Sequence, residues 1–253
     1  WNRPPAGNVS PVLPLPMLQT LISEANSRDP DLAPDLLIVV AARAEHDAVV
    51  KPLRAIPNNA QTILLVQSGV GKSSAATATA ATLAQNRFRI VLNAGIAGAL
   101  PLAGEKVCRV GDVVLGSRSV FADEGIREPG GFRTCEQMGF PVTTSGMAVP
   151  GDAEMLKALK NIADHTGPIA TVSTCSGTDG AAVEIARRTG AIAEAMEGAA
   201  VGLAAERAGA RFAELRVISN LTGDRHEQDW DLPGSLARLG EVTAEAAARL
   251  LPA

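Results

Sequence analysis

The chain has 253 residues, of which 46% are hydrophobic and 20% charged, an ordinary composition for a globular protein. A net charge of −4 without any local cluster of Lys and Arg argues against a nucleic-acid partner, and no apolar run is long enough to cross a bilayer. The 3 cysteines have no CxxC or Cys/His spacing, so the sequence predicts reduced thiols in the cytoplasm, with no disulfide framework and no metal site.

The first 34 residues differ from the rest of the chain. They lack the basic start and the long apolar stretch of a secretory signal. They contain Pro4, Pro5, Pro11, Pro14, Pro16, Pro30 and Pro34. We predict an irregular leader over residues 1–34, with a short helix around Met17 to Ala25, followed by a single domain over residues 35–253.

In that domain, apolar strand-like runs alternate with Ala-rich helical stretches. The predicted strands are Leu36–Ala41, Thr62–Gln67, Arg89–Asn93, Asp112–Ser117, Ile169–Thr174, Ala191–Ala195 and Ala213–Ser219. The predicted helices are Glu45–Ile56, Lys72–Asn86, Ala153–Asp164, Ala181–Thr189, Glu197–Ala208 and Gly234–Leu251. Several strands are apolar throughout, as strands covered on both faces are, so the pattern predicts an α/β/α layered fold. The Gly- and Pro-rich stretch Glu124–Gly151 is predicted to be a long loop or hairpin of the kind that covers active sites.

Two glycine-rich segments follow predicted strands. Gly71-Lys72-Ser73 matches the end of a nucleotide-binding P-loop, but Val66 stands where that motif needs its first Gly, so we reject ATP binding. What remains is a tight turn, which either brings backbone N–H groups to a small ligand or simply connects strand to helix. In Asn93–Gly98, small residues leave backbone bare where the chain is expected to leave the sheet. This favours a ligand-binding segment with Ala94, Gly95, Ala97 and Gly98 as contacts, or else close helix–sheet packing.

Polar residues stand at the ends of two later strands. Met196 and Glu197 lie between a predicted strand and helix, where one carboxylate can accept hydrogen bonds from both hydroxyls of a ribose or can be a plain helix-start residue. Ser219 and Asn220 end another apolar strand, with Asp224 shortly after it. Polar groups at the end of a buried strand are costly unless they have partners, which favours a site.

Taken in order, these segments resemble the nucleoside phosphorylase and nucleosidase superfamily, from about Leu36 to Leu251. The matching segments are the first strand with Glu45 beyond it, Ser68–Lys72, Asn93–Gly98, Gly111–Val114, Met196–Gly198 and Arg216–Asn220. Within the superfamily, Ser219–Arg225 with Trp230-Asp231-Leu232-Pro233 after it is similar to the futalosine hydrolases. These act in a menaquinone pathway and release hypoxanthine from an inosine-like nucleoside.

The resemblance implies a three-layer α/β/α fold with a twisted mixed central sheet, a catalytic domain without metal or cofactor, and a homo-oligomer whose neighbouring subunit helps close the pocket. It implies that Glu45 activates water, that Glu197 binds the ribose hydroxyls beside Met196, and that Asn220 contacts the purine, with Asp224 as a reserve proton donor or orienting group. Methylthioadenosine/S-adenosylhomocysteine nucleosidases have Asp where this chain has Asn220. No aromatic residue in Thr174–Gly177 is available to stack on the base.

The sequence therefore predicts hydrolysis of the N-glycosidic bond of a 6-oxopurine nucleoside, futalosine in particular. A methylthioadenosine/S-adenosylhomocysteine nucleosidase and a purine nucleoside phosphorylase are the alternatives, the latter because Arg43 and Lys72 lie near the relevant turns. The alternative from another class is a non-catalytic nucleoside-binding protein.

Overall fold

The structure is a computed structural model and describes residues 18–23, 36–56, 63–86, 88–102 and 105–251. Its centre is a mixed sheet in the order β1-β3-β2-β4-β12-β11-β7-β10, with β13 paired to both β4 and β7. The strands are β1 (Leu18–Ser23), β2 (Leu36–Val40), β3 (Ile63–Gln67), β4 (Ile90–Ala99), β7 (Val113–Phe121), β10 (Ala148–Pro150), β11 (His165–Thr171), β12 (Ala193–Ala195) and β13 (Arg211–Leu221). Strands β2, β3, β4 and β13 run parallel to one another, whereas β12 pairs antiparallel with β4 and β13 antiparallel with β7.

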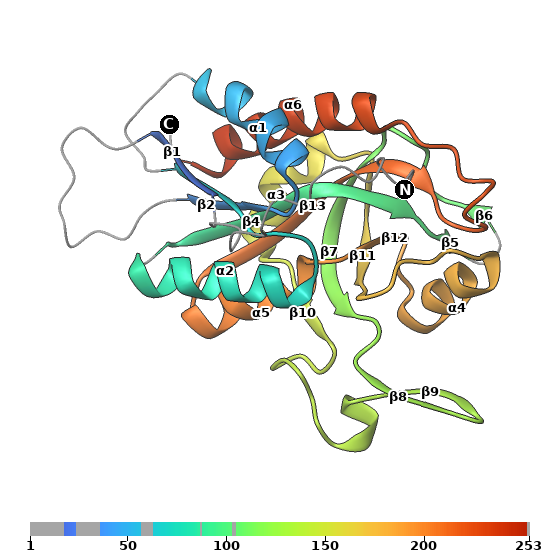
Figure 1. Ribbon diagram of the computed structural model, residues 1–253. Helices are drawn as coiled ribbons and strands as arrows, with labels where there is room; N and C mark the ends of the chain where they lie inside the picture. The colour runs from blue at the N-terminus through green and yellow to red at the C-terminus, as the bar shows by residue number, and fades with distance from the viewer. Residues whose placement is uncertain (1–17, 24–35, 57–62, 87, 103–104, 252–253) are drawn as a thin grey trace, which may run out of the picture.

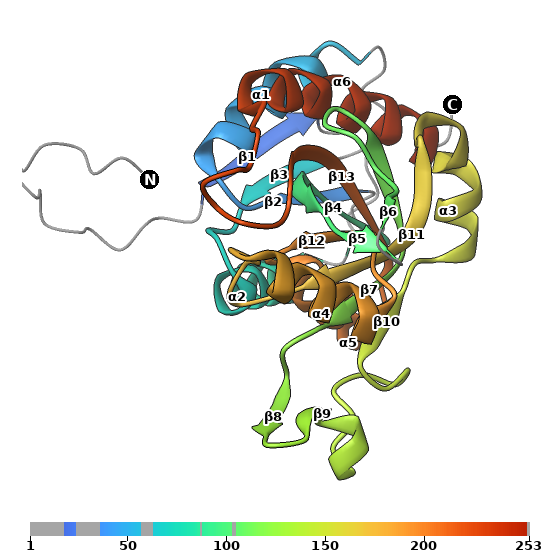
Figure 2. The ribbon, with the colours of Figure 1, turned by 90° about the vertical axis from the view of Figure 1, so that its right-hand side faces the viewer.

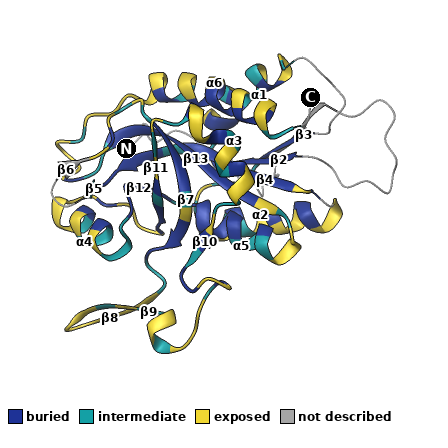
Figure 3. Cartoon of the chain, turned by 180° about the vertical axis from the view of Figure 1, so that it is seen from behind, coloured by how far each residue is buried: buried dark blue, intermediate teal, exposed yellow. Residues whose placement is uncertain are grey.

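Helices cover both faces of this sheet (Figures 1 and 2). They are α1 (Arg43–Arg54), α2 (Lys72–Gln85), α3 (Ala153–Leu159), α4 (Asp179–Thr189), α5 (Gly198–Ala208) and α6 (Leu232–Leu250). One apolar cluster joins α1, α3 and α6 to the sheet, and a second joins α2 and α5 to its other face. The central strands are buried while the outer helix faces are exposed (Figure 3). The expected three-layer fold is confirmed, because apolar strands covered on both faces need a helical layer on each side.

The strand β4 is longer than the sequence indicated. It runs to Ala99 through all of Asn93–Gly98, which we expected to form where the chain leaves the sheet. β13 pairs with β4 from Arg211 against Ile90 to Leu221 against Ala99, and this ladder keeps the small residues extended. The expectation that the chain leaves the sheet there was therefore wrong, since pairing with a distant strand outweighed the local glycine signal.

The short helix expected around Met17 to Ala25 was also wrong. Residues Leu18–Ser23 form β1, which pairs antiparallel with β3 at one edge of the sheet. The rest of the predicted leader lies outside the described residues. A local sequence of mixed apolar and polar residues has no strong preference, so the available sheet edge decides its conformation.

Much of the stretch Glu124–Gly151 leaves the body of the molecule, and its end returns to the central sheet as β10 beside β7. It contains the hairpin β8 (Gly125–Glu128) and β9 (Gly131–Thr134), a short 3₁₀ helix (Glu136–Met138) and β10. Figures 1 and 2 show β8 and β9 projecting away from the central sheet. The short strands β5 (Pro101–Leu102) and β6 (Glu105–Lys106) pair with each other at another side. No helix in the described part of the chain is long and apolar enough to span a membrane.

Candidate active site

A cavity of about 440 Å³ opens at the carboxyl ends of the parallel strands. Its walls come from the segments that follow β2, β3, β11, β12 and β13, and from residues near the carboxyl ends of β4, β12 and β13 themselves. Open α/β sheets bind ligands at this edge, because the loops there diverge and leave a crevice. A cavity of this size, mostly apolar with a few polar groups, suits a small organic ligand.

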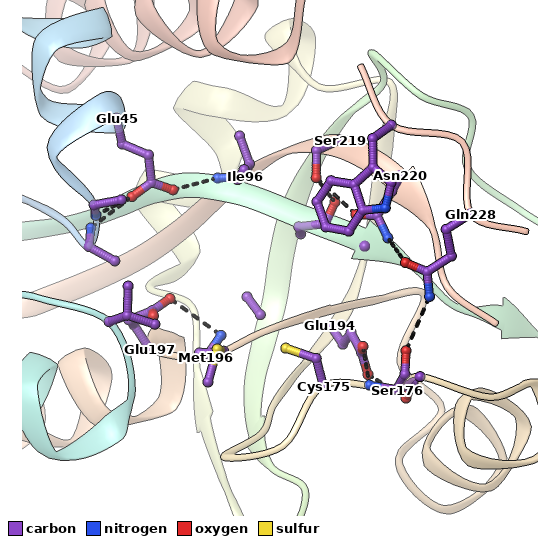
Figure 4. Close-up of a pocket in the computed structure, with 18 of the residues that line it drawn as sticks. Glu45, Ile96, Cys175, Ser176, Glu194, Met196, Glu197, Ser219, Asn220 and Gln228 are labelled. Atoms are coloured by element: carbon purple, nitrogen blue, oxygen red, sulfur yellow. Dashed lines mark hydrogen bonds between the residues drawn. The ribbon is translucent and has the colours of Figure 1, made fainter. Parts of the chain in front are cut away.

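Glu45 lies at one end of the cavity, in the first turn of α1. Its Oε2 accepts hydrogen bonds from the backbone N–H groups of Ala41 (2.9 Å) and Ala42 (2.8 Å), and its Oε1 accepts one from Ile96 (2.9 Å) (Figure 4). The side chain is buried, and burial raises the pKa of the carboxyl even though Arg216 and the backbone donors lower it. Glu45 is thus a fixed carboxylate with an increased affinity for protons, as a general base requires.

Arg216 lies beneath this end of the cavity and is 1% exposed. Its Nε donates to Glu214 Oε1 (2.8 Å), its Nη2 donates to Asn93 Oδ1 (2.5 Å), and its Nη1 lies 3.4 Å from Glu197 Oε2. Burial alone would lower the pKa of Arg216, but Glu214, Glu197 and Glu45 outweigh it and raise the pKa. One buried cation therefore stabilises a group of carboxylates that would otherwise repel each other.

Glu197 follows β12 and immediately precedes α5. Its Oε1 accepts a hydrogen bond from the backbone N–H of Gly71 (3.0 Å), and its Oε2 accepts one from Met196 N (3.3 Å). Figure 4 shows Glu197 at the same end of the cavity as Glu45, on another wall. The tight turn after β3 therefore uses its Gly71 N–H to hold a side chain of the site.

The opposite end of the cavity is held by neutral amides. Asn220 Nδ2 donates to Gln228 Oε1 (3.2 Å), and Asn220 Oδ1 accepts from the hydroxyl of Ser219 (2.9 Å). Gln228 Oε1 also accepts from Arg225 Nη1 (3.1 Å), and its Nε2 donates to Gly223 O (2.7 Å). Both atoms of the Gln228 amide are engaged, so its oxygen is fixed toward Asn220, and Asn220 must present its NH₂ group on this side.

Comparisons with known proteins identify the family of this chain. A family model for the phosphorylase superfamily matches residues 43–252. The chain is 39% identical over 220 residues to the futalosine hydrolase of Acidothermus cellulolyticus, a match that covers 82% of this chain and 88% of that protein. The chain belongs to the futalosine hydrolase family.

Two solved structures share the fold of this family member. The futalosine hydrolase of Helicobacter pylori superposes with a TM-score of 0.69 at 17% identity, covering 86% of this chain and 97% of that one. The 5′-methylthioadenosine/S-adenosylhomocysteine nucleosidase of Neisseria meningitidis, solved with methylthio-immucillin-A, gives a TM-score of 0.70 at 20% identity over 84% and 98% of the two chains. The resemblance seen in the sequence motifs is thereby confirmed for both the family and the fold.

The site residues expected from the sequence fall into two groups. Those that line the cavity are Glu45, Ala97, Gly98, Met196, Glu197, Ser219 and Asn220. Ala94, Gly95 and Asp224 lie outside its lining. Ala94 belongs to the apolar core, and Gly95 faces Arg216 and Glu45, where an added Cβ would overlap the Arg216 Nη1. Ala94 is packed in the core and the space at Gly95 is filled by Arg216 and Glu45, so neither residue borders the cavity.

Asp224 has a structural partner instead. Its Oδ1 accepts a hydrogen bond from the backbone N–H of Asp179 (3.2 Å) at the start of α4, and its own N–H lies 3.3 Å from Asp179 Oδ1. The side chain is exposed, and it anchors the loop after β13 to α4. Asp47, two residues beyond Glu45, pairs with Arg43 on the solvent side of α1.

Several residues at or beneath the cavity received no role from the sequence. Arg216 and Glu214 are two charged residues inside an otherwise apolar strand, and the cost of burying them is the signal that could have found them. Trp230, named in the sequence only as part of the family motif, lines the cavity, and the guanidinium of Arg225 lies 4.6 Å from its ring centre. Gln228 and Glu194 also line it, and their positions depend on contacts with residues far away in the sequence.

Proposed function

We propose that this chain hydrolyses the N-glycosidic bond of futalosine and releases hypoxanthine. The observation that carries the proposal is the pair of buried carboxylates, Glu45 and Glu197, at one end of a cavity whose other end presents a side-chain amide. Membership of the futalosine hydrolase family supports the substrate. The enzyme would work without a cofactor or metal, in the cytoplasm.

In this mechanism Glu45 takes a proton from a water molecule while the water oxygen attacks the anomeric carbon of the sugar. Glu197 accepts hydrogen bonds from the ribose hydroxyls, beside Met196. The bond to the base breaks, and the base leaves with the electron pair of that bond. Asn220 donates an N–H hydrogen bond to the purine and stabilises the charge that develops on it. Trp230 supplies an apolar face for the base.

Water is favoured over phosphate as the nucleophile because three cations, Arg43, Lys72 and Arg216, already have anionic partners. Arg43 Nε is bound to Asp47 (2.8 Å), and Lys72 Nζ is bound to Asp123 (2.5 Å) and Glu124 (2.8 Å). Arg216 is likewise held by Glu214, and Glu197 occupies the Gly71 N–H that a phosphate would need. Three carboxylates around Arg216 would repel an entering phosphate.

We also propose that the protein works as a homo-oligomer. The support is the excursion of residues 124–147, which projects from the body and exposes 71% of Phe140. None of these residues lines the cavity of the described chain. Sedimentation velocity would show a species larger than 26.0 kDa, the mass of one chain.

The test is chromatography of the products after incubation with futalosine, inosine and methylthioadenosine, each with and without phosphate. Release of hypoxanthine from futalosine in phosphate-free buffer is expected. A requirement for phosphate would make the protein a phosphorylase, and efficient cleavage of methylthioadenosine would move it to the neighbouring nucleosidases. Binding of nucleosides without release of a base would identify a non-catalytic binding protein.

A further inference from the structure

Glu194 is a buried carboxylate in the wall of the cavity that the mechanism above does not use. It lies on β12 and is 4% exposed. Its Oε1 accepts a hydrogen bond from the backbone N–H of Ser176 (2.7 Å), and its Oε2 accepts one from the Ser176 hydroxyl (2.7 Å) (Figure 4). A carboxylate offers about four acceptor positions, so two remain for a ligand.

Strand register places Glu194 opposite Asn220. On β4, Gly98 pairs with Asn220 of β13 on one side and with Glu194 of β12 on the other. Paired residues on neighbouring strands point to the same face of a sheet, and the strands lie about 4.8 Å apart. Asn220 and Glu194 therefore flank Gly98 in one row, separated by two strand spacings.

Only glycine fits at the position between them. A Cβ on Gly98 would lie 3.3 Å from Asn220 Nδ2 and would overlap the methyl group of Thr222, with 2.7 Å to its Cγ2. Gly98, Asn220 and Glu194 all line the cavity. A flat ring can lie against Gly98 with a donor on one side and an acceptor on the other.

A series of hydrogen bonds also links Asn220 to Glu194. Asn220 donates to Gln228 Oε1 (3.2 Å), Gln228 Nε2 lies 3.4 Å from the carbonyl oxygen of Ser176, and Ser176 holds Glu194. The Asn220 amide and the Glu194 carboxylate thus belong to one hydrogen-bonded rim around this end of the cavity. Their orientations depend on each other, so the donor and the acceptor stay at fixed positions.

A 6-oxopurine has the matching pattern, since O6 and N7 accept hydrogen bonds and N1–H donates one. Adenine has the reverse pattern at its 6-substituent and N1, because N6 donates and N1 accepts. We propose that Glu194 is a specificity-determining residue that accepts a hydrogen bond from N1–H of the base, opposite the Asn220 amide that donates to O6 or N7. This inference rests on the proposed function and deepens it, because it assigns recognition of hypoxanthine to two side chains. An unprotonated N1 meeting this carboxylate would leave two acceptors facing each other, which rejects adenine.

The test is Glu194→Gln, because a glutamine side chain can donate to N1 of adenine where glutamate can only accept. Steady-state turnover is measured with futalosine and with the same nucleoside carrying adenine, and binding is measured with inosine and adenosine. We expect kcat/KM for futalosine to fall by about 10- to 100-fold and the adenine-to-hypoxanthine preference to rise. Glu206→Gln is the matched control, since Glu206 bonds to Thr144 away from the cavity. A purely structural role for Glu194 would lower both activities and leave their ratio unchanged, and that result overturns the proposal.

A second measurement uses the unaltered protein and applies even if Glu194→Gln fails to fold. 1-Methylinosine lacks the N1–H donor, and we expect it to bind at least about 100-fold more weakly than inosine. Equal binding of the two nucleosides overturns the role of Glu194. Failure of the unaltered protein to release hypoxanthine from futalosine would instead refute the proposed function, whereas the ratio of inosine to 1-methylinosine binding would still report on Glu194.

Discussion

The two ends of the cavity are built from different interactions. At one end, Arg216 is buried among carboxylates, with Glu214 at 2.8 Å and Glu197 at 3.4 Å. At the other end, Asn220 and Gln228 are joined by hydrogen bonds between neutral amides. Removing one member of a buried charged group leaves an unpaired charge and costs more than removing one neutral hydrogen bond. We expect the charged end around Arg216 to stabilise charge in the transition state, and the amide end, with Glu194 beside it, to choose between bases.

The carboxyl groups of the two ends respond alike to burial, but they are proposed to act in different ways. Burial raises the pKa of Glu45 at the charged end, and it raises the pKa of Glu194 near the amide end. Glu45 is proposed to act by accepting a proton, whereas Glu194 is proposed to act by accepting a hydrogen bond. Substitutions at each end should therefore affect different measured quantities, which gives the following tests.

The largest effect is expected for Glu45→Gln. An amide cannot take a proton from water, so turnover should fall by about 10²-fold or more while nucleoside binding remains. Single-turnover rates and inosine binding measure the two quantities separately. Asp47→Asn is the control, since Asp47 pairs with Arg43 outside the cavity and its removal should leave turnover unchanged. Loss of turnover in the control with retention in Glu45→Gln would assign the base to Asp47.

Glu197→Gln should reduce kcat/KM by about 10- to 150-fold, from the loss of a charged hydrogen-bond acceptor worth about 1.5–3 kcal/mol. Its amide can still accept from the Gly71 N–H through its oxygen, so the protein should fold, but the loss of one carboxylate beside Arg216 should lower the thermal unfolding midpoint. Glu241→Gln on the exposed side of α6 provides the same change away from the site. Wild-type kinetics in Glu197→Gln would show that Glu197 only begins the helix.

Asn220→Asp should weaken the discrimination between 6-oxopurine and adenine nucleosides at the amide end. An ionised carboxylate has no N–H to donate to O6, and it would face the oxygen of Gln228, so the preference for inosine over adenosine should fall about tenfold, or about 1.4 kcal/mol. Competition binding with the two nucleosides measures this ratio. An unchanged ratio would mean that Asn220 does not read the base.

The pH dependence of turnover should show the raised pKa of Glu45. The base must be ionised to act, and a raised pKa keeps it protonated up to a higher pH, so activity should fall as pH decreases through a value above 4.5. The decline should be about tenfold per pH unit below that midpoint. Glu194→Gln should retain this acid limb in kcat for futalosine, because it leaves Glu45 in place. A midpoint at or below the ordinary value of 4.5 would contradict the assignment of Glu45 as the base.

The smallest effect concerns the packing behind the charged end. A Cβ on Gly198 would overlap the carboxylate of Glu214, which holds Arg216 and accepts from the hydroxyl of Ser119. Gly198→Ala should therefore destabilise the protein by about 1–3 kcal/mol, seen as a lower thermal midpoint. Gly180→Ala in α4 has open space at its Cβ and should raise or maintain stability. Equal midpoints for the two variants would show that the charged end adjusts to an added methyl group.

Much of the fold was accessible from the sequence because its signals are local. Apolar runs such as that of β2 and the Ala-rich pattern of α5 indicated the alternating elements. The junction of β12 and α5 also has a local pattern, so the sequence alone was enough to place Glu197 between strand and helix. The family motifs located Glu45 just beyond the first strand in the same way.

Other features were decided only when distant segments met. The ladder between β4 and β13 kept Asn93–Gly98 extended and turned Gly95 toward Arg216, although the glycines by themselves favour a turn. An available edge of β3 made a strand of β1.

The candidate site also has features that local sequence predicts and features that depend on distant contacts. The sequence by itself determined the layered fold, the junction that carries Glu197 and the polar end of the strand at Asn220. Only the tertiary structure decided that Arg216 joins Glu214 to Glu197, and that Glu194 lies across Gly98 from Asn220. The physical reason is that strand formation depends on neighbours in the chain, whereas the partners of a buried charge come from other strands and are fixed by register.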